Sequence, residues 1–153
     1  MSIDENKALA HRYLEEVYGK GNLDIVDECL DRDVEDHEEF GDQKPAGLVG
    51  IKELVMAFRA AFPDINVTIE DLVAEGDRVF IRANWEGTHK GEFMGISPTG
   101  KRIFFSSMDE IRISDGKIKE HWGITDTIAL ATQLGAISME DEYPGGSSLY
   151  LDG

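Results

Sequence analysis

The sequence has 153 residues, of which 41% are hydrophobic and 30% are charged. This length suits a single domain, and a domain of this size buries about two-thirds of its unfolded surface, enough for a core and a pocket. The formal net charge is −16, from 31 acidic and 15 basic residues. A surface this acidic repels the phosphates of nucleic acids and of anionic membranes, so we expect neither as a partner.

The cysteine count and the hydrophobic runs bear on the cellular compartment. Cys29 is the only cysteine, so no intramolecular disulfide can form, and its apolar neighbours in residues 25–30 indicate a buried thiol. No apolar run reaches the length of a membrane span, and the first residues lack a signal-peptide pattern. We therefore expect a cytoplasmic protein.

The chain is predicted to begin with two helices. Ser2 and Glu5 have the spacing of a capping box, and apolar residues then recur with helical spacing over residues 9–18. A second, short helix is expected to follow as far as residue 30, with Asn22 as its N-cap.

A strand, a loop and a longer helix are predicted next. Residues 34–40 suit a short strand, and residues 42–47 suit a loop that contains a proline. The clearest helix covers residues 51–62, where five apolar side chains form one stripe before Pro63 ends the pattern.

From residue 65 onward the apolar residues alternate with polar ones, which is typical of strands. Strands are predicted over residues 65–70, 79–88, 103–113 and 118–125, separated by turns at 75–77 and 114–117 and by a loop over 87–100. Asp126 is expected to cap a last helix that ends at Gly135. Helices followed by a strand meander, without βαβ units, indicate an α+β fold in which a curved antiparallel sheet surrounds an internal pocket. We assign residues 1–135 to this domain and residues 136–153 to an acidic tail that contains glycine and serine.

Polar residues interrupt one apolar face of the strand predicted over 103–113. That face reads Ile103, Phe105, Ser107, Asp109, Ile111 and Ile113. A buried carboxylate is costly unless it is paired or hydrogen-bonded. Asp109 is therefore either a structural acid, bonded for example to Arg82 or Arg112, or a pocket acid or base with a raised pKa.

The next strand carries a histidine that could meet this carboxylate. Period two places His121 on the same face as Gly123 and Thr125, and Trp122 on the opposite face. If the pairing register brings His121 to Asp109, the two form a plausible general-base unit. Otherwise His121 is a hydrogen-bonded structural or interface residue. Trp122 is either part of the core or a platform for a substrate.

Four further polar residues are candidates for the pocket, each with a simpler alternative. His37 and His89 lie near predicted strand ends, where a histidine commonly caps a strand or faces solvent. Arg82 could pair with a strand carboxylate or bind an anionic substrate, and Asp126 could serve only as a helix cap. The histidines lack metal-ligand spacing, and the chain has no phosphate-binding glycine loop and no nucleophile elbow, so we predict no metal site.

Several motifs are similar to those of one family. They are GTHKGEFMGISPTG over residues 87–100, IRI over 111–113, DGKIKEHW over 115–122, QLG over 133–135 and the opening stretch over 6–30. In this combination the chain resembles the SnoaL-like polyketide cyclase, or ester cyclase, family over roughly residues 3–135.

The resemblance implies the cone-shaped α+β fold of nuclear transport factor two and steroid isomerase, with a deep apolar pocket and a homodimer. It also implies a small apolar, polyketide-like substrate, whose ring is closed by intramolecular aldol condensation without a metal or a cofactor. The resemblance places Tyr18, Ser107 and Gly123 at the pocket; together with the candidates from the residue patterns, the residues expected around it are Tyr18, His37, Leu54, Phe58, Arg82, Trp85, His89, Ser107, Trp122, Gly123 and Asp126.

One position departs from the family. Its members place their working carboxylate two residues after the strand histidine, where this chain has Gly123. The histidine and the glutamine that assist in those cyclases correspond to Asp109 and Ser107, while His121 is retained. We therefore predict Asp109 and His121 as the catalytic residues. The alternatives are a non-catalytic binding module and an enzyme like limonene-epoxide hydrolase, in which Arg82 and Asp109 would belong to an Asp–Arg–Asp set.

Overall fold

The structure is a computed structural model that describes residues 1–38 and 45–138. Its elements, in chain order, are α1 (Ile3–Arg12), η1 (Tyr13–Gly19), α2 (Asp24–Cys29), β1 (Leu30–Asp36), α3 (Gly47–Ala61), β2 (Asn66–Glu75), β3 (Arg78–Thr88), β4 (Arg102–Ser114), β5 (Lys117–Thr125) and α4 (Thr127–Leu134). The end of the predicted first strand, most of the predicted loop over 42–47 and most of the predicted tail lie outside the described residues. No described helix combines the length and the apolar character that crossing a bilayer requires.

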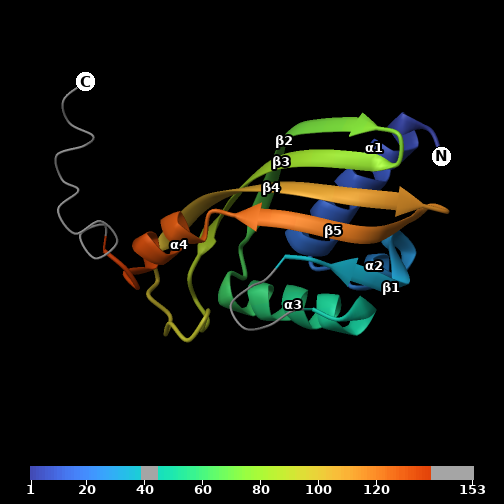
Figure 1. The fold of residues 1–153 in the computed structure, drawn as a ribbon. Helices are drawn as coiled ribbons and strands as arrows, with labels where there is room; N and C mark the ends of the chain where they lie inside the picture. The colour runs from blue at the N-terminus through green and yellow to red at the C-terminus, as the bar shows by residue number, and fades with distance from the viewer. Residues whose placement is uncertain (39–44, 139–153) are drawn as a thin grey trace, which may run out of the picture.

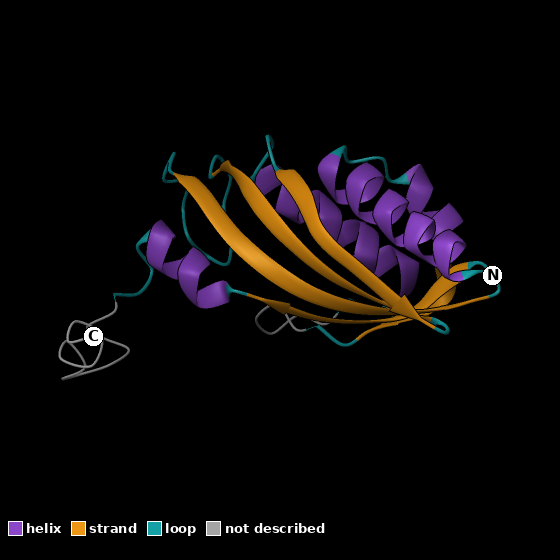
Figure 2. Ribbon diagram, turned by 90° about the horizontal axis from the view of Figure 1, so that it is seen from above, coloured by secondary structure: helices purple, strands orange, loops and turns teal. Residues whose placement is uncertain are grey.

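The five strands form one sheet in the order β1-β5-β4-β3-β2. Strands β2 to β5 form an antiparallel meander, and β1 adds to β5 in parallel, so the sheet is mixed rather than wholly antiparallel as predicted. Figure 2 shows the strands curving, with the N-terminal helices packed against one face of the sheet. The predicted α+β class is confirmed, and this inner face, together with the helices, builds the core.

Strict alternation decides which strand residues face the helices. In β3 the odd-numbered residues from Val79 to Trp85 are buried, and in β4 the odd-numbered residues from Ile103 to Ser107 are buried as well. The register pairs Asp109 with Gly123, and Ile111 with His121. Asp109 and His121 therefore lie on the same inner face, which is the condition that the sequence left open.

The first helix extends beyond α1, because α1 continues without a break into η1, a π-helical segment (Figure 1). The capping box of Ser2 and Glu5 is confirmed, since each side chain bonds the backbone of the other. At the other end, the guanidinium of Arg59 donates to the carbonyls of Tyr18 and Gly19, at 2.8 and 2.9 Å. These bonds satisfy carbonyl groups that would otherwise lack partners at a helix end.

Other boundaries differ from the prediction. Asn22 does not cap α2 with its side chain; only its backbone carbonyl accepts a bond, from the amide of Ile25. Strand β1 begins at Leu30, because Leu30 is buried and pairs with β5, which the alternation within β1 alone could not reveal. Strand β2 extends to Glu75 because it pairs with β3 as far as the turn. The cap at Asp126 is confirmed by its bond from the amide of Ala129, at 2.9 Å.

Candidate functional site

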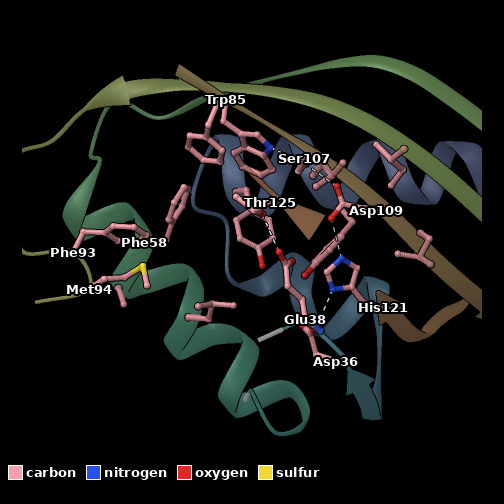
Figure 3. A pocket seen from close by; sticks show the side chains of 18 of the residues that line it. Asp36, Glu38, Phe58, Trp85, Phe93, Met94, Ser107, Asp109, His121 and Thr125 are labelled. Atoms are coloured by element: carbon pink, nitrogen blue, oxygen red, sulfur yellow. Dashed lines mark hydrogen bonds and ion pairs between the residues drawn. The ribbon is translucent and has the colours of Figure 1, made fainter. Parts of the chain in front are cut away.

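A cavity of about 570 Å³ lies between the helices and the inner face of the sheet. Its lining comes from η1, α3, the strands β1, β3, β4 and β5, the residues that follow β1, and the loop after β3. The lining residues are Tyr13, Leu14, Tyr18, Asp36, Glu38, Leu54, Ala57, Phe58, Ile81, Trp85, Glu92, Phe93, Met94, Gly95, Phe105, Ser107, Asp109, Ile111, His121 and Thr125. Figure 3 shows Phe58, Phe93 and Met94 on one side and Asp36, Asp109 and His121 on the other. The pocket thus has an apolar part and a polar end.

Aromatic rings make the apolar wall. Trp85 and Phe105 are stacked, with an interplanar angle of 2° and 6.0 Å between ring centroids. Phe58 and Tyr18 each meet the Trp85 ring edge-on, at 5.9 and 5.6 Å. Such ring pairs hold one another in place, so the wall is rigid and presents flat surfaces to whatever enters the pocket.

A chain of hydrogen bonds runs along the polar end. The Trp85 indole donates to the hydroxyl of Ser107, at 2.9 Å, and that hydroxyl donates to Asp109 Oδ2, at 2.8 Å. Asp109 Oδ1 lies 3.0 Å from His121 Nε2, and His121 Nδ1 lies 3.0 Å from Asp36 Oδ1. One imidazole ring therefore bridges two buried carboxylates, of which Asp36 was not predicted.

The two carboxylates decide the protonation of His121. Burial by itself would lower the pKa of His121, but the hydrogen bonds that the ring donates to Asp109 and Asp36 outweigh it and raise the pKa to about 10. At neutral pH the ring is an imidazolium that donates from both nitrogens. The predicted contact between His121 and Asp109 exists, but the ring is a fixed cation there and not a free base.

A third carboxylate, that of Glu38, reaches the same place from the end of β1. Thr125 Oγ1 donates to Glu38 Oε1, at 2.9 Å, as the dashed line in Figure 3 shows. A Cβ atom built on Gly123 would overlap Glu38 Oε2 and would lie 3.0 Å from Asp109 Oδ1. Burial first, and then the nearby charges of Asp109 and Asp36, raise the pKa of Glu38 against the opposing effects of Thr125 and His121.

Three of these groups are close enough to be considered as metal ligands. One oxygen each of Glu38 and Asp109 and one nitrogen of His121 lie within 4.8 Å of one another. However, both ring nitrogens of His121 are engaged with carboxylates. In the protonated state that its pKa implies, the ring has no lone pair to offer a cation.

The structure brings together seven of the predicted site residues at the pocket: Tyr18, Leu54, Phe58, Trp85, Ser107, Asp109 and His121. Gly123 lies at its polar end without contributing a side chain. The remaining five residues lie elsewhere. His89 is fully buried beside Phe62 and bonds Thr99, and Asp126 caps α4.

Arg82, Trp122 and His37 do not line the cavity, contrary to the prediction. Arg82 and Trp122 each occupy a strand position next to an inward-facing residue, so alternation turns them to the outer face. Arg82 binds Asp71 there, with Nε 3.0 Å from Oδ2, and His37 stacks on Trp122 at 4.7 Å. The Asp–Arg–Asp arrangement therefore does not form among the residues that the structure describes.

Residues that were not predicted also line the cavity, among them Asp36, Glu38, Tyr13, Glu92, Phe93 and Met94. A signal for two of them was present, since Val34, Asp36 and Glu38 alternate as one face of a strand and the acids follow a buried apolar residue. The same interruption of an apolar row had identified Asp109. Phe93 and Met94 lie in the loop after β3, where no periodicity predicts direction.

A curved sheet wrapped around N-terminal helices, with an apolar cavity that ends in buried carboxylates, defines a cone-shaped α+β protein with an internal pocket. Residues 8–134 match the family model described as SnoaL-like polyketide cyclase. This chain belongs to that family, which confirms the resemblance inferred from the sequence motifs.

Individual relatives agree with this assignment. The chain is 28% identical over 127 residues to the nogalonic acid methyl ester cyclase of Streptomyces nogalater, covering 82% of this chain and 94% of the relative. The crystal structure of AclR from Streptomyces galilaeus is 31% identical, with a TM-score of 0.78 over 90% of this chain and 100% of that one. A SnoaL-like polyketide cyclase from Agrobacterium tumefaciens is 25% identical, with a TM-score of 0.72 over 88% of this chain and 100% of that one.

Proposed function

We propose that this protein is a cyclase that binds a flat, apolar, polyketide-like molecule in the pocket and closes a ring by general acid–base chemistry. One observation carries the proposal: the aromatic cavity ends in a buried chain of Asp36, His121 and Asp109. A hydrophobic cavity with a few convergent polar groups of perturbed pKa is the usual form of an active site.

The reaction suited to such a site is an intramolecular aldol closure. A base removes a proton from a carbon next to a carbonyl, the resulting enolate attacks a second carbonyl, and the new alkoxide takes a proton back. The carboxylates at the polar end supply the base and return the proton, and the imidazolium of His121 offsets the negative charge that develops beside it. Proton transfer by a positioned side chain contributes about 10²- to 10⁴-fold to rate.

The charge of the pocket favours a substrate that is neutral at its reacting end. The lining holds four carboxyl groups, from Asp36, Glu38, Glu92 and Asp109, against the single cation His121. No lysine or arginine belongs to the lining formed by residues 1–38 and 45–138. A free carboxylate on the substrate would be repelled, whereas its methyl ester would not.

Incubation with nogalonic acid methyl ester, the compound in the name of the Streptomyces nogalater relative, tests the proposal. We expect ring closure, which chromatography of the product detects. The kcat/KM should be at least about tenfold higher for the ester than for the free acid, a difference in activation free energy of about 1.4 kcal/mol. A free acid that reacts as fast as the ester would contradict the charge argument. Quenching of tryptophan fluorescence by the ester without any conversion would identify a binding protein instead.

We also propose a homodimer that forms through the outer face of the sheet. Helices α1 and α3 cover only the inner face (Figure 2). The outer face presents large apolar side chains that are between 49% and 78% exposed, namely Val73, Phe80, Phe104, Met108 and Ile124. The register places Met108 opposite Ile124, and Val73 opposite Phe80, so two apolar pairs lie on this face, with Arg82 and Glu110 between them. Large apolar patches of this kind commonly mark interfaces.

Met108→Asp is expected to weaken this dimer at least about tenfold, since it places a carboxylate in an apolar interface at a cost of about 1–3 kcal/mol. Sedimentation equilibrium of the wild-type and variant proteins measures the change. Val49→Asp, at an exposed position on α3 away from the sheet, serves as the matched control. A wild-type protein that is monomeric at all concentrations, or equal effects of both substitutions, would contradict the proposed interface.

A further inference from the structure

We propose that Glu38 is the side chain that takes and returns the proton in this pocket, and that Gly123 is glycine because the Glu38 carboxylate occupies the place of its side chain. The inference deepens the proposed function by naming its acid–base residue, and it rests on that function for the identity of the substrate.

Glu38 comes from the end of β1, and its carboxylate occupies the place where a Cβ atom of Gly123 in β5 would lie. Figure 3 shows Glu38 at the polar end of the pocket with Asp109 and His121. Any side chain at position 123 would overlap Glu38 Oε2. Because the backbone at Gly123 is ordinary strand, conformation does not require glycine there. A Cβ atom there would meet carboxylate oxygens instead, Glu38 Oε2 first and then Asp109 Oδ1 at 3.0 Å, so it would require the Glu38 side chain to move out of this place.

Most polar atoms at this end of the pocket are already engaged in hydrogen bonds. Both oxygens of Asp109 accept hydrogen bonds, from Ser107 and His121, and both ring nitrogens of His121 are bonded. Glu38 Oε1 accepts from Thr125, while Glu38 Oε2 has no hydrogen-bond partner among the described residues. Glu38 is also partly exposed to the cavity, whereas Asp36 is 4% exposed and accepts bonds from His121 and from the amide of Glu38. Oε2 is thus free to meet a substrate.

The pKa values of His121 and Glu38 distinguish the group that keeps its proton from the group that can exchange one. His121 holds its proton at neutral pH, because its pKa is raised to about 10. The groups that face Glu38 are Asp36, Asp109, His121 and Tyr18, and burial together with the two aspartates raises the pKa of Glu38 toward neutrality. A carboxyl group whose pKa is closer to the working pH both accepts and returns a proton more effectively.

The proposed step balances without an oxidant, a reductant or a cofactor. Glu38 Oε2 takes the proton from the carbon next to the substrate carbonyl, which leaves a neutral carboxylic acid and an enolate. The enolate forms the new carbon–carbon bond, and its target carbonyl becomes an alkoxide. The carboxylic acid of Glu38 then gives its proton to that alkoxide and is again a carboxylate.

The test uses a proton-abstraction probe that does not depend on the natural substrate. A carboxylate base removes the C3 proton of 5-nitrobenzisoxazole, whose N–O bond then breaks to give the coloured 2-cyano-4-nitrophenolate. We expect the wild-type protein to exceed the rate of free acetate and Glu38→Gln to lose about 10²-fold or more of that rate. Glu35→Gln, an exposed glutamate on the outer side of β1, is the control and is expected to react like the wild-type protein.

A carboxylate exchange checks that the position, and not the fold, is responsible. Glu38→Ala should lose the activity, and adding Gly123→Asp to that variant should restore at least about tenfold of it, because the new carboxylate enters the space that Glu38 has left. Gly123→Asp alone should fail to gain activity, since both carboxylates compete for one place. Circular dichroism and thermal unfolding verify that each variant is folded.

The outcomes separate this inference from the proposed function. The assignment of Glu38 is overturned if Glu38→Gln keeps the wild-type rate, or if Asp109→Asn abolishes the rate while Glu38→Gln does not. It is also overturned if the wild-type protein is no faster than free acetate. If the probe depends on Glu38 but nogalonic acid methyl ester is not cyclised, Glu38 is supported as the base while the proposed cyclase function fails.

Discussion

Replacement of His121 by leucine is expected to lower the free energy of unfolding by about 3–5 kcal/mol at neutral pH. The imidazolium lies between Asp36 and Asp109, at 3.0 Å from each, and these carboxylates belong to side chains that are only 4% and 10% exposed. Without the cation, two buried like charges face each other with no compensation. Urea unfolding of the wild-type and variant proteins measures the difference.

Two comparisons assign the loss to charge rather than to packing. In the triple variant Asp36→Asn, His121→Leu and Asp109→Asn, no buried charge is left unpaired, so most of the stability should return. His11→Leu removes an exposed histidine that pairs with Glu15 and should change stability by less than about 0.5 kcal/mol. If the triple variant is as unstable as His121→Leu, the packing of the ring and not its charge is what stabilises the site.

Much of this site could be predicted because strands alternate. The apolar row of β4 identified Ser107 and Asp109 as inward-facing, whereas the pairing register decided whether His121 of β5 meets them. The face of each residue within β4 needs only local sequence. The turn at residues 114–117 does not by itself fix the register, because an irregularity between Arg112 and Ile113 shifts the pairing by one residue and so places His121 opposite Ile111.

Asp36 and Glu38 could not be placed in the same way. Asp36 meets His121 across 85 positions of the chain, through the parallel pairing of β1 with β5. Nothing local specifies that pairing, since parallel strands are joined by long connections. The charge state of His121 depends on the second carboxylate, so the role of the ring could not be inferred without the fold.

The family resemblance has a complementary weakness. It placed pocket residues correctly on β4 and β5, where Ser107, Asp109 and His121 line the cavity. Arg82 and Trp122 were candidates from the strand pattern and not from the resemblance, and each lies one residue from an inward-facing position. At Gly123 the resemblance indicated a missing carboxylate, whereas the structure places the carboxylate of Glu38 in the same space from another strand. A position that lacks the family's catalytic side chain can thus hold a carboxylate that comes from another strand.

The stability of the folded protein is expected to fall between pH 6.5 and about 10, by as much as about 1.4 kcal/mol per pH unit. The pKa of His121 is about 10 in the folded state, against 6.5 for an unperturbed histidine. The folded state therefore keeps a proton that the unfolded state releases. The resulting stabilisation is complete below pH 6.5 and is lost as the pH rises through the folded pKa. Glu38, whose pKa is also raised, contributes in the same direction at lower pH.

Urea unfolding at a series of pH values, for the wild-type protein and for His121→Leu, isolates this contribution. Carboxylates with lowered pKa, such as Asp64, which Thr88 holds by hydrogen bonds, act in the opposite direction but titrate only in acid. They are the same in both proteins, so they do not affect the difference between them. We expect that difference in the free energy of unfolding to be largest near pH 6.5 and to shrink as the pH approaches 10. The ring then loses its proton, and with it the positive charge that offsets Asp36 and Asp109. A difference that is constant over this range would mean that His121 stabilises the fold as a neutral ring. His121 could then exchange a proton itself, and one of the reasons for assigning that role to Glu38 would fail.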